Sequence, residues 1–135
     1  MGLPSVIARF LPQHAARRPR TRLFPGVPVS ATETRGLRDE GVLVVDVREP
    51  REWAAGHVDG SRNIPLDVLG PDLLPAGIPV VLVCRNGHRA GLAARILAAL
   101  GMDPTEIFVL ADGLTSWNSS ALPLVNVHER AGHLV

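Results

Sequence analysis

The fold is decided by the stretch Val80-Val81-Leu82-Val83-Cys84-Arg85-Asn86-Gly87-His88-Arg89-Ala90. Its first four residues are apolar without interruption, as are residues 42–45 and 107–110. Such runs are typical of strands buried on both faces, because a half-exposed strand carries a polar residue at every second position. We therefore expect an α/β fold in which a single parallel sheet is covered by helices on both faces.

Segments with helix signals lie between these apolar runs. Ser30 and Glu33 have the spacing of a capping box, which predicts a helix that runs to about Glu40. Between residues 90 and 100 an apolar stripe predicts a helix that packs on the sheet; it is formed by Leu92, Ile96 and Leu100, with Ala93 and Leu97 beside it. Shorter helices are expected at residues 49–54, around 67–69 and from 112 to about 118.

Length and composition indicate one soluble domain. The chain has 135 residues, of which 46% are hydrophobic and 4% aromatic, and a net charge of +1. No apolar run has the roughly 18 residues that a membrane span needs, and so small a charge favours neither nucleic acid nor membrane binding. We expect a cytoplasmic protein that binds neither.

The ends of the chain differ from its middle. Residues 1–26 hold five arginines and four prolines and no acidic residue, which favours a solvated tail over a targeting peptide or a docking arm. Residues 126–135 have no clear periodicity, and we interpret His128 and His133 there as solvated side chains rather than metal ligands. The domain is therefore expected to span residues 27–125.

Three unusual segments follow the three apolar runs. They are residues 46–48, 84–89 and 111–113. The carboxyl ends of parallel strands meet at one edge of the sheet, where ligands bind in open α/β folds. All three segments are thus expected to face one site.

Cys84 is the only cysteine, so it forms no internal disulfide and no site built from several thiolates. A cysteine between a buried strand and a helix N-terminus has its thiolate form favoured by the helix dipole and by free N–H groups. A loop with Gly87 at its middle can form an N–H cradle for an anion, and Arg85 and Arg89 add positive charge. These features favour a reactive thiolate over an inert core thiol.

Several motifs in residues 27–125 resemble those of the rhodanese-like family. The first runs from Asp46-Val47-Arg48 through Glu52-Trp53 to Gly56-His57 and Asn63-Ile64-Pro65, the second is Cys84 to Ala90, and the third is Asp112-Gly113-Leu114 with Trp117 and residues 122–125. Asp112 departs from the family pattern, which usually has paired glycines at the start of the third motif. A carboxylate there would weaken anion binding.

The resemblance implies a sulfurtransferase. Cys84 would take a sulfane sulfur from thiosulfate or a persulfide donor, hold it as a persulfide, and pass it to cyanide or a thiol, including one of a sulfur-relay protein. No metal or cofactor is expected. The substrate would be bound by the loop residues Arg85, Asn86, Gly87, His88 and Arg89, with Asp46 and Arg48 in support.

Several alternatives stay open at this point. A sulfur carrier or regulatory module without turnover is the rival to an enzyme. A cysteine phosphatase or arsenate reductase is less favoured, because four residues rather than five separate Cys84 from Arg89. Arg89 either faces the substrate or, as we prefer, turns back to a carboxylate such as Asp46; Arg48 either steers anions or pairs with Glu52. Four residues of the first and third motifs are interpreted as structural: His57, Asn63, Trp53 and Trp117.

Overall fold

A five-stranded, all-parallel sheet forms the centre of the protein, whose computed structural model describes residues 25–135. The strand order is β1-β5-β4-β2-β3. The strands are β1 (Val27–Val29), β2 (Leu43–Asp46), β3 (Arg62–Asn63), β4 (Val80–Val83) and β5 (Ile107–Leu110). All four residues of the central strand β4 are buried, which confirms the interpretation of its continuous apolar run.

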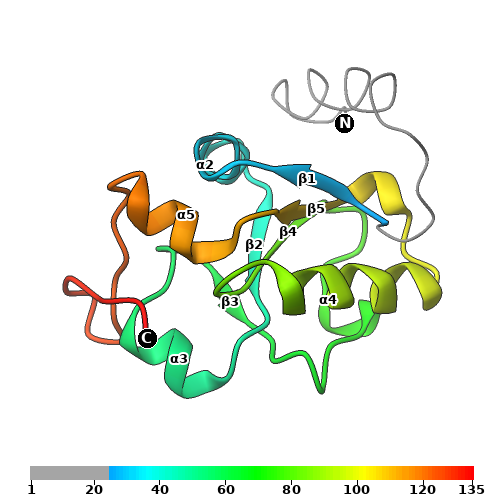
Figure 1. Ribbon diagram of the computed structural model, residues 1–135. Helices are drawn as coiled ribbons and strands as arrows, with labels where there is room; N and C mark the ends of the chain where they lie inside the picture. The colour runs from blue at the N-terminus through cyan, green and yellow to red at the C-terminus, as the bar shows by residue number, and fades with distance from the viewer. Residues whose placement is uncertain (1–24) are drawn as a thin grey trace.

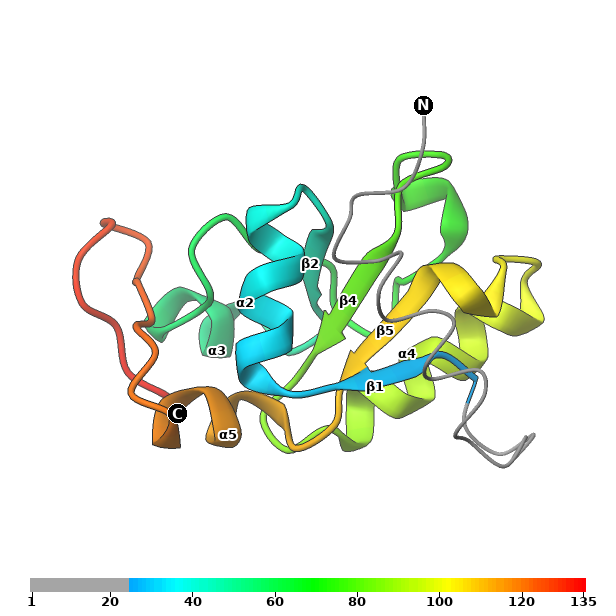
Figure 2. The same ribbon diagram turned by 90° about the horizontal axis from the view of Figure 1, so that it is seen from above.

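Helices cover both faces of this sheet (Figure 1). The helices α2 (Ala31–Asp39) and α5 (Gly113–Ser119) pack together on one face, and α4 (His88–Ala99) covers the other. Figure 2 shows the same layers from above, with α2 in front of the sheet and α4 behind it. The short α3 (Pro50–Ala55) follows β2, and two 3₁₀ turns, η1 (Pro71–Leu73) and η2 (Pro104–Glu106), complete the elements. The predicted α/β fold with a parallel sheet is therefore confirmed.

The ends of the helices follow local sequence signals in most cases. The capping box that starts α2 is present, since Ser30 Oγ accepts from Glu33 N at 3.1 Å and Glu33 Oε1 accepts from Ser30 N at 2.9 Å. The helix predicted around residues 67–69 is wrong, because residues 66–68 form a turn and the helical turn is η1. Gly70 precedes a proline and takes an extended conformation, which prevents a helix from running through it.

The buried face of α4 differs from the predicted one. Leu92, Ile96 and Leu100 are exposed, with relative accessibilities of 37%, 36% and 59%. The face against the sheet is formed by Ala90, Ala93, Ala94 and Leu97, all of them fully buried. Both stripes have helical spacing, and the small alanines allow the helix to lie close to the sheet. The size of the leucines was thus a poor guide to which stripe packs.

Residues 126–135 hydrogen bond with the domain. Val125 pairs with His57 and with Ala131 in antiparallel bridges, and His133 N donates to Ala55 O at 3.0 Å. In Figure 1 this segment lies beside α3 and α5. His128 and His133 are exposed. The N-terminal segment predicted at 1–26 lies almost entirely outside the described residues, and within 25–135 no helix is long and apolar enough to cross a membrane.

Candidate active site

Cys84 lies directly after β4 and four residues before the start of α4. Its sulfur accepts hydrogen bonds from two backbone N–H groups, of Gly87 at 3.1 Å and of Ala90 at 3.3 Å. Both donors belong to the loop and the first turn of α4, so they are free of helix partners. The predicted N–H cradle is thus present, with the sulfur of Cys84 at its centre. The residue is fully buried, with 0% relative accessibility.

Two glycines allow this loop to pack closely against the segment that follows β5. Gly87 has a φ of 92°, and a Cβ on it would overlap the carbonyl oxygen of Ala111. Gly113 has a φ of 66°, and a Cβ there would overlap the carbonyl of Arg85. Leu114 N also donates to Cys84 O at 2.8 Å. The segments after β4 and β5 therefore meet, as the rule for parallel strands predicts.

Arg89 turns back to a carboxylate, but the partner is Glu52 and not Asp46. Its two terminal nitrogens donate to Glu52 Oε1 at 2.7 Å and to Glu52 Oε2 at 3.0 Å. The Arg89 hydrogen bond holds the pKa of Glu52 below its ordinary value, although burial opposes this shift. The pKa of Arg89 is raised, first by Glu52 and to a smaller extent by Cys84 and Asp46. The preferred orientation, with Arg89 turned back to a carboxylate, is therefore observed with a different partner, and its role in the site stays a prediction.

Asp46 and Arg48 form a fully buried ion pair with each other. Arg48 Nη2 lies 2.8 Å from Asp46 Oδ2, and both side chains have 0% accessibility. Arg48 Nη2 also donates to Gly56 O at 2.7 Å, whereas Arg48 Nη1 has no partner among the described residues. Both predictions for Arg48 are therefore wrong, since a buried guanidinium cannot steer anions from solution and its partner is not Glu52.

The other loop residues lie on the outer side of the cradle. Arg85, Asn86 and His88 are exposed, and Arg85 has no ion pair within residues 25–135. Asn86 Oδ1 accepts from His88 N at 3.1 Å, in the turn that leads into α4. Their binding of a substrate stays a prediction. Asp112 is also exposed, at the N-terminal end of α5.

The residues interpreted as structural make contacts of that kind. Asn63 Nδ2 donates to the carbonyls of Asp46 and Arg48, at 3.0 and 2.9 Å. His57 stacks on Trp53, with ring centroids 3.6 Å apart. The fully buried Trp117 donates to Pro123 O at 2.9 Å. These contacts fix the backbone around the site.

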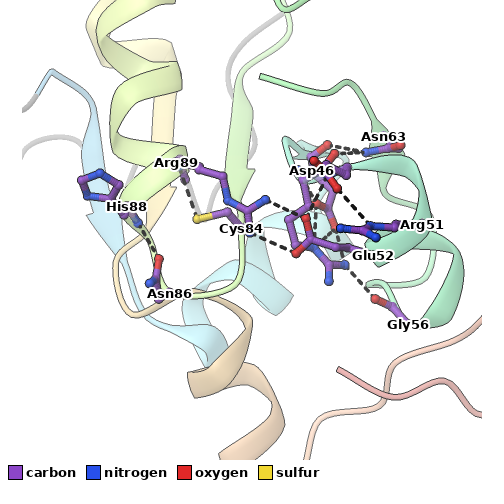
Figure 3. Close-up of polar contacts among 12 residues, drawn as sticks. Asp46, Arg51, Glu52, Gly56, Asn63, Cys84, Asn86, His88 and Arg89 are labelled. Carbon is purple, nitrogen blue, oxygen red and sulfur yellow. Dashed lines mark hydrogen bonds and ion pairs between the residues drawn. The ribbon is translucent and has the colours of Figure 1, made fainter. Parts of the chain in front are cut away.

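The pairing of Glu52 with Arg89 was not predicted from the sequence, which offered Glu52 only as a partner of Arg48. Figure 3 shows Glu52 reaching from α3 toward Arg89, which lies beside Cys84. Its Oε1 also accepts from Glu49 N at 3.1 Å, so the start of α3 fixes the carboxylate. The pairing joins residues 37 positions apart. The only local signal was the spacing of Glu49 and Glu52, which indicates a helix start and says nothing of Arg89.

The fold and the site together define an α/β domain with one cysteine held in a loop of backbone N–H groups. The chain belongs to the rhodanese-like domain family, which matches residues 30–120. It is 31% identical over 94 residues to the thiosulfate sulfurtransferase GlpE of Ectopseudomonas mendocina, covering 68% of this chain and 84% of that protein.

Two further relatives are similar to parts of the chain. The uncharacterized protein slr1261 of Synechocystis is 36% identical over 90 residues, or 65% of this chain, but the chain spans only 49% of that protein's length. The crystal structure of a rhodanese-related protein from Thermoplasma volcanium superposes with a TM-score of 0.64 at 26% identity, covering 73% of this chain and 97% of that one. The family and its fold, predicted from the three motifs, are confirmed.

Proposed function

We propose that this protein is a sulfurtransferase that carries a sulfane sulfur as a persulfide on Cys84. The donor is thiosulfate or a persulfide, and the acceptor is cyanide or a thiol. The observation that carries the proposal is the pair of N–H groups, of Gly87 and Ala90, that point at the Cys84 sulfur. The similarity to a thiosulfate sulfurtransferase over two thirds of the chain supports thiosulfate as the donor.

The reaction takes two nucleophilic steps at sulfur. The Cys84 thiolate attacks the outer sulfur of thiosulfate, the sulfur–sulfur bond of the donor breaks, and sulfite leaves with the electron pair. Cyanide or a thiolate then attacks the outer sulfur of the Cys84 persulfide, which releases thiocyanate or a new persulfide and restores the thiolate. The loop N–H groups stabilise negative charge on sulfur in both steps, because they are fixed before the reaction begins.

Arg85 is a cation that can meet the donor without first leaving an ion pair. It is exposed next to Cys84 and has no ion pair within the described part of the chain, whereas Arg89 is held by Glu52 and Arg48 by Asp46. A guanidinium that is free to move offers two parallel N–H donors to an oxyanion such as the sulfonate end of thiosulfate. Arg85 therefore orients the donor, and Cys84 does the chemistry.

Sulfur loading of the purified protein tests this proposal. After incubation with thiosulfate, intact mass spectrometry should show one added sulfur atom, which cyanide removes as thiocyanate. Cys84→Ser is the matched control and should show neither signal. A folded wild-type protein that gains no sulfur from thiosulfate and forms no thiocyanate would exclude the enzyme.

The burial of Cys84 favours a second candidate, a sulfur carrier that is loaded by a partner protein. A fully buried sulfur meets a free anion only after the loop moves, and a docked partner is one way to move it. Such a carrier would gain one sulfur from a persulfidated partner protein while remaining unloaded by thiosulfate. Loading by thiosulfate at a rate that supports continuous thiocyanate formation would exclude the carrier.

A further inference from the structure

The Cys84 sulfur is buried, and the side chain of Arg89 beside it is held by a separate element, α3. Cys84 is fully buried, although its neighbours Arg85 and Asn86 are exposed. An open cavity of about 900 Å³ lies between α3 and the segment after β3, and its walls include Val47, Leu66, Arg51 and Arg89 but not Cys84. Arg89 therefore lies both on the wall of the cavity and beside Cys84 (Figure 3).

We propose that Glu52 is a positioning residue that holds Arg89 as a cover over Cys84, and that an anionic sulfur donor in this cavity opens the site by drawing Arg89 away from Glu52. The second half of this inference rests on the proposed function, and the first half does not. The cover is defined as the Arg89–Glu52 pair.

The geometry of the pair fits a cover that is stable but exchangeable. Two hydrogen bonds of 2.7 and 3.0 Å join the planar guanidinium to both carboxylate oxygens, which is the bidentate arrangement that fixes an arginine side chain in one orientation. The side chains keep 31% and 17% of their surface accessible, for Arg89 and Glu52. Water and ions therefore reach the pair, unlike the buried pair of Asp46 and Arg48.

Glu52 is held in place independently of Arg89. Its Oε1 accepts from Glu49 N at 3.1 Å, and α3 begins just after the buried pair of Asp46 and Arg48. Arg89, in contrast, lies on the first turn of α4 and reaches the carboxylate through a long side chain with many rotamers. When the pair opens, the structure thus favours movement of Arg89 over movement of Glu52.

Charge explains why an anionic donor would open the cover. Thiosulfate carries two negative charges, so it competes with a single carboxylate for the guanidinium and gives Arg89 a new bidentate partner. A neutral reagent offers no such exchange and reaches the sulfur only when the pair opens by itself. The charged groups around the pair are Asp46 at the end of β2, Arg48 two residues later, Glu49 and Arg51 at the start of α3, and Asp67 on the wall of the same cavity. The thiol of Cys84 also lies near Arg89.

Alkylation of Cys84 by neutral iodoacetamide tests the cover without any sulfur transfer. In Glu52→Gln the side chain keeps its size but loses the charge that holds Arg89. The alkylation rate should rise about fivefold, the factor that corresponds to roughly 1 kcal/mol for a partly exposed ion pair. Arg51→Ala is the matched control: it removes another α3 arginine on the same cavity, which pairs with Glu49, and should leave the rate unchanged.

The rate must be followed to alkaline pH, since Glu52→Gln also alters the charge near the thiol. An opened cover raises the plateau that is reached when every thiol is ionised. A charge effect on Cys84 moves the midpoint of the profile and, because a thiolate of lower pKa is a weaker nucleophile, does not raise the plateau. Added salt should raise the wild-type plateau and leave that of Glu52→Gln unchanged, because salt screens the ion pair. A plateau that is equal in the two proteins, or a salt response that is equal, would overturn the cover.

The role of the donor is measured separately by the rate of sulfur loading from thiosulfate. We expect Glu52→Gln to lower the thiosulfate concentration for half-maximal loading, because Arg89 no longer has to leave a carboxylate. An unchanged or higher concentration would overturn opening by the donor. If the wild type gains no sulfur from thiosulfate while the alkylation plateau is raised in Glu52→Gln, the proposed function is excluded and the cover is retained.

Discussion

Replacing Arg48 by Met should cost the protein a large part of its stability. Arg48 is fully buried and gives Asp46 three side-chain hydrogen bonds, from Nε at 3.0 and 3.2 Å and from Nη2 at 2.8 Å. The same Nη2 donates to the buried carbonyl of Gly56. Methionine has a similar length and fills most of the space, so the loss is one of charge and donors.

The expected loss is about 4 kcal/mol. Removing one partner of a buried ion pair costs roughly 3–5 kcal/mol, because the remaining charge is left uncompensated in a place that water does not reach. After the substitution Asp46 keeps only the backbone N–H of residue 48, at 3.0 Å. Domains of this size have a total stability of about 5–15 kcal/mol. Arg48→Met should therefore bring the protein close to its unfolding threshold.

Urea unfolding measures this loss directly. With a slope of about 2 kcal/mol per molar urea, the midpoint should fall by about 2 M. Arg38→Met is the matched control, since Arg38 makes an exposed pair with Asp39, and it should change the stability by less than about 1 kcal/mol. Asp46→Asn combined with Arg48→Met should be more stable than Arg48→Met alone, because no unpaired charge is left. A loss below about 1 kcal/mol, or a double variant no better than the single one, would refute the reasoning.

Three further predictions concern the site. Cys84→Ser should abolish sulfur loading in the mass spectrum yet unfold within about 1 kcal/mol of the wild type, since a hydroxyl can accept from the same N–H groups; an unfolded variant would instead show an inert core cysteine. Arg85→Ala should raise the KM for thiosulfate about tenfold and that for a neutral persulfide much less, since one charge-assisted contact is lost; equal effects on both would contradict a charge role. The pKa of Glu52 is lowered by Arg89, so its contribution to stability is present above the ordinary value of 4.5 and is lost as the pH falls through the lowered folded value. Thermal unfolding should therefore show a smaller acid loss in Glu52→Gln than in the wild type, and identical curves would contradict the pairing.

The sheet could be predicted from the sequence because its signal is local. Residues 80–83 are apolar at every position, and that pattern requires burial on both faces. The face of α4 that packs on the sheet could not be predicted. Leu92 and Leu97 lie on neighbouring stripes of equal period, and only packing against the sheet determines that Leu97 is buried and Leu92 exposed. The sequence of a helix gives the period of its apolar residues but not how closely each face can approach the sheet.

In the site, too, features with a local sequence signal could be predicted and features that depend on tertiary packing could not. The cradle around Cys84 was predictable, because a strand, a short loop and a helix start follow one another in the sequence and fix the direction of the N–H groups. The partners of Arg89 and Arg48 could not be predicted, since the first motif alone contains several carboxylates with which either arginine could pair. Their choice depends on how α3 is turned after β2, which no periodicity records.

The two ion pairs near the site differ in burial, and burial decides which of them can take part in function. The Asp46–Arg48 pair is fully buried. Opening it would leave two charges without water or partners, and the free energy required makes the open state too rare to take part in function. The Arg89–Glu52 pair is reached by solvent, so opening it exchanges one set of polar partners for another. The first pair therefore fixes α3 and, through it, Glu52, while the second is the one that a substrate can rearrange. We therefore expect access to Cys84 to require opening of the Arg89–Glu52 pair while the Asp46–Arg48 pair stays closed.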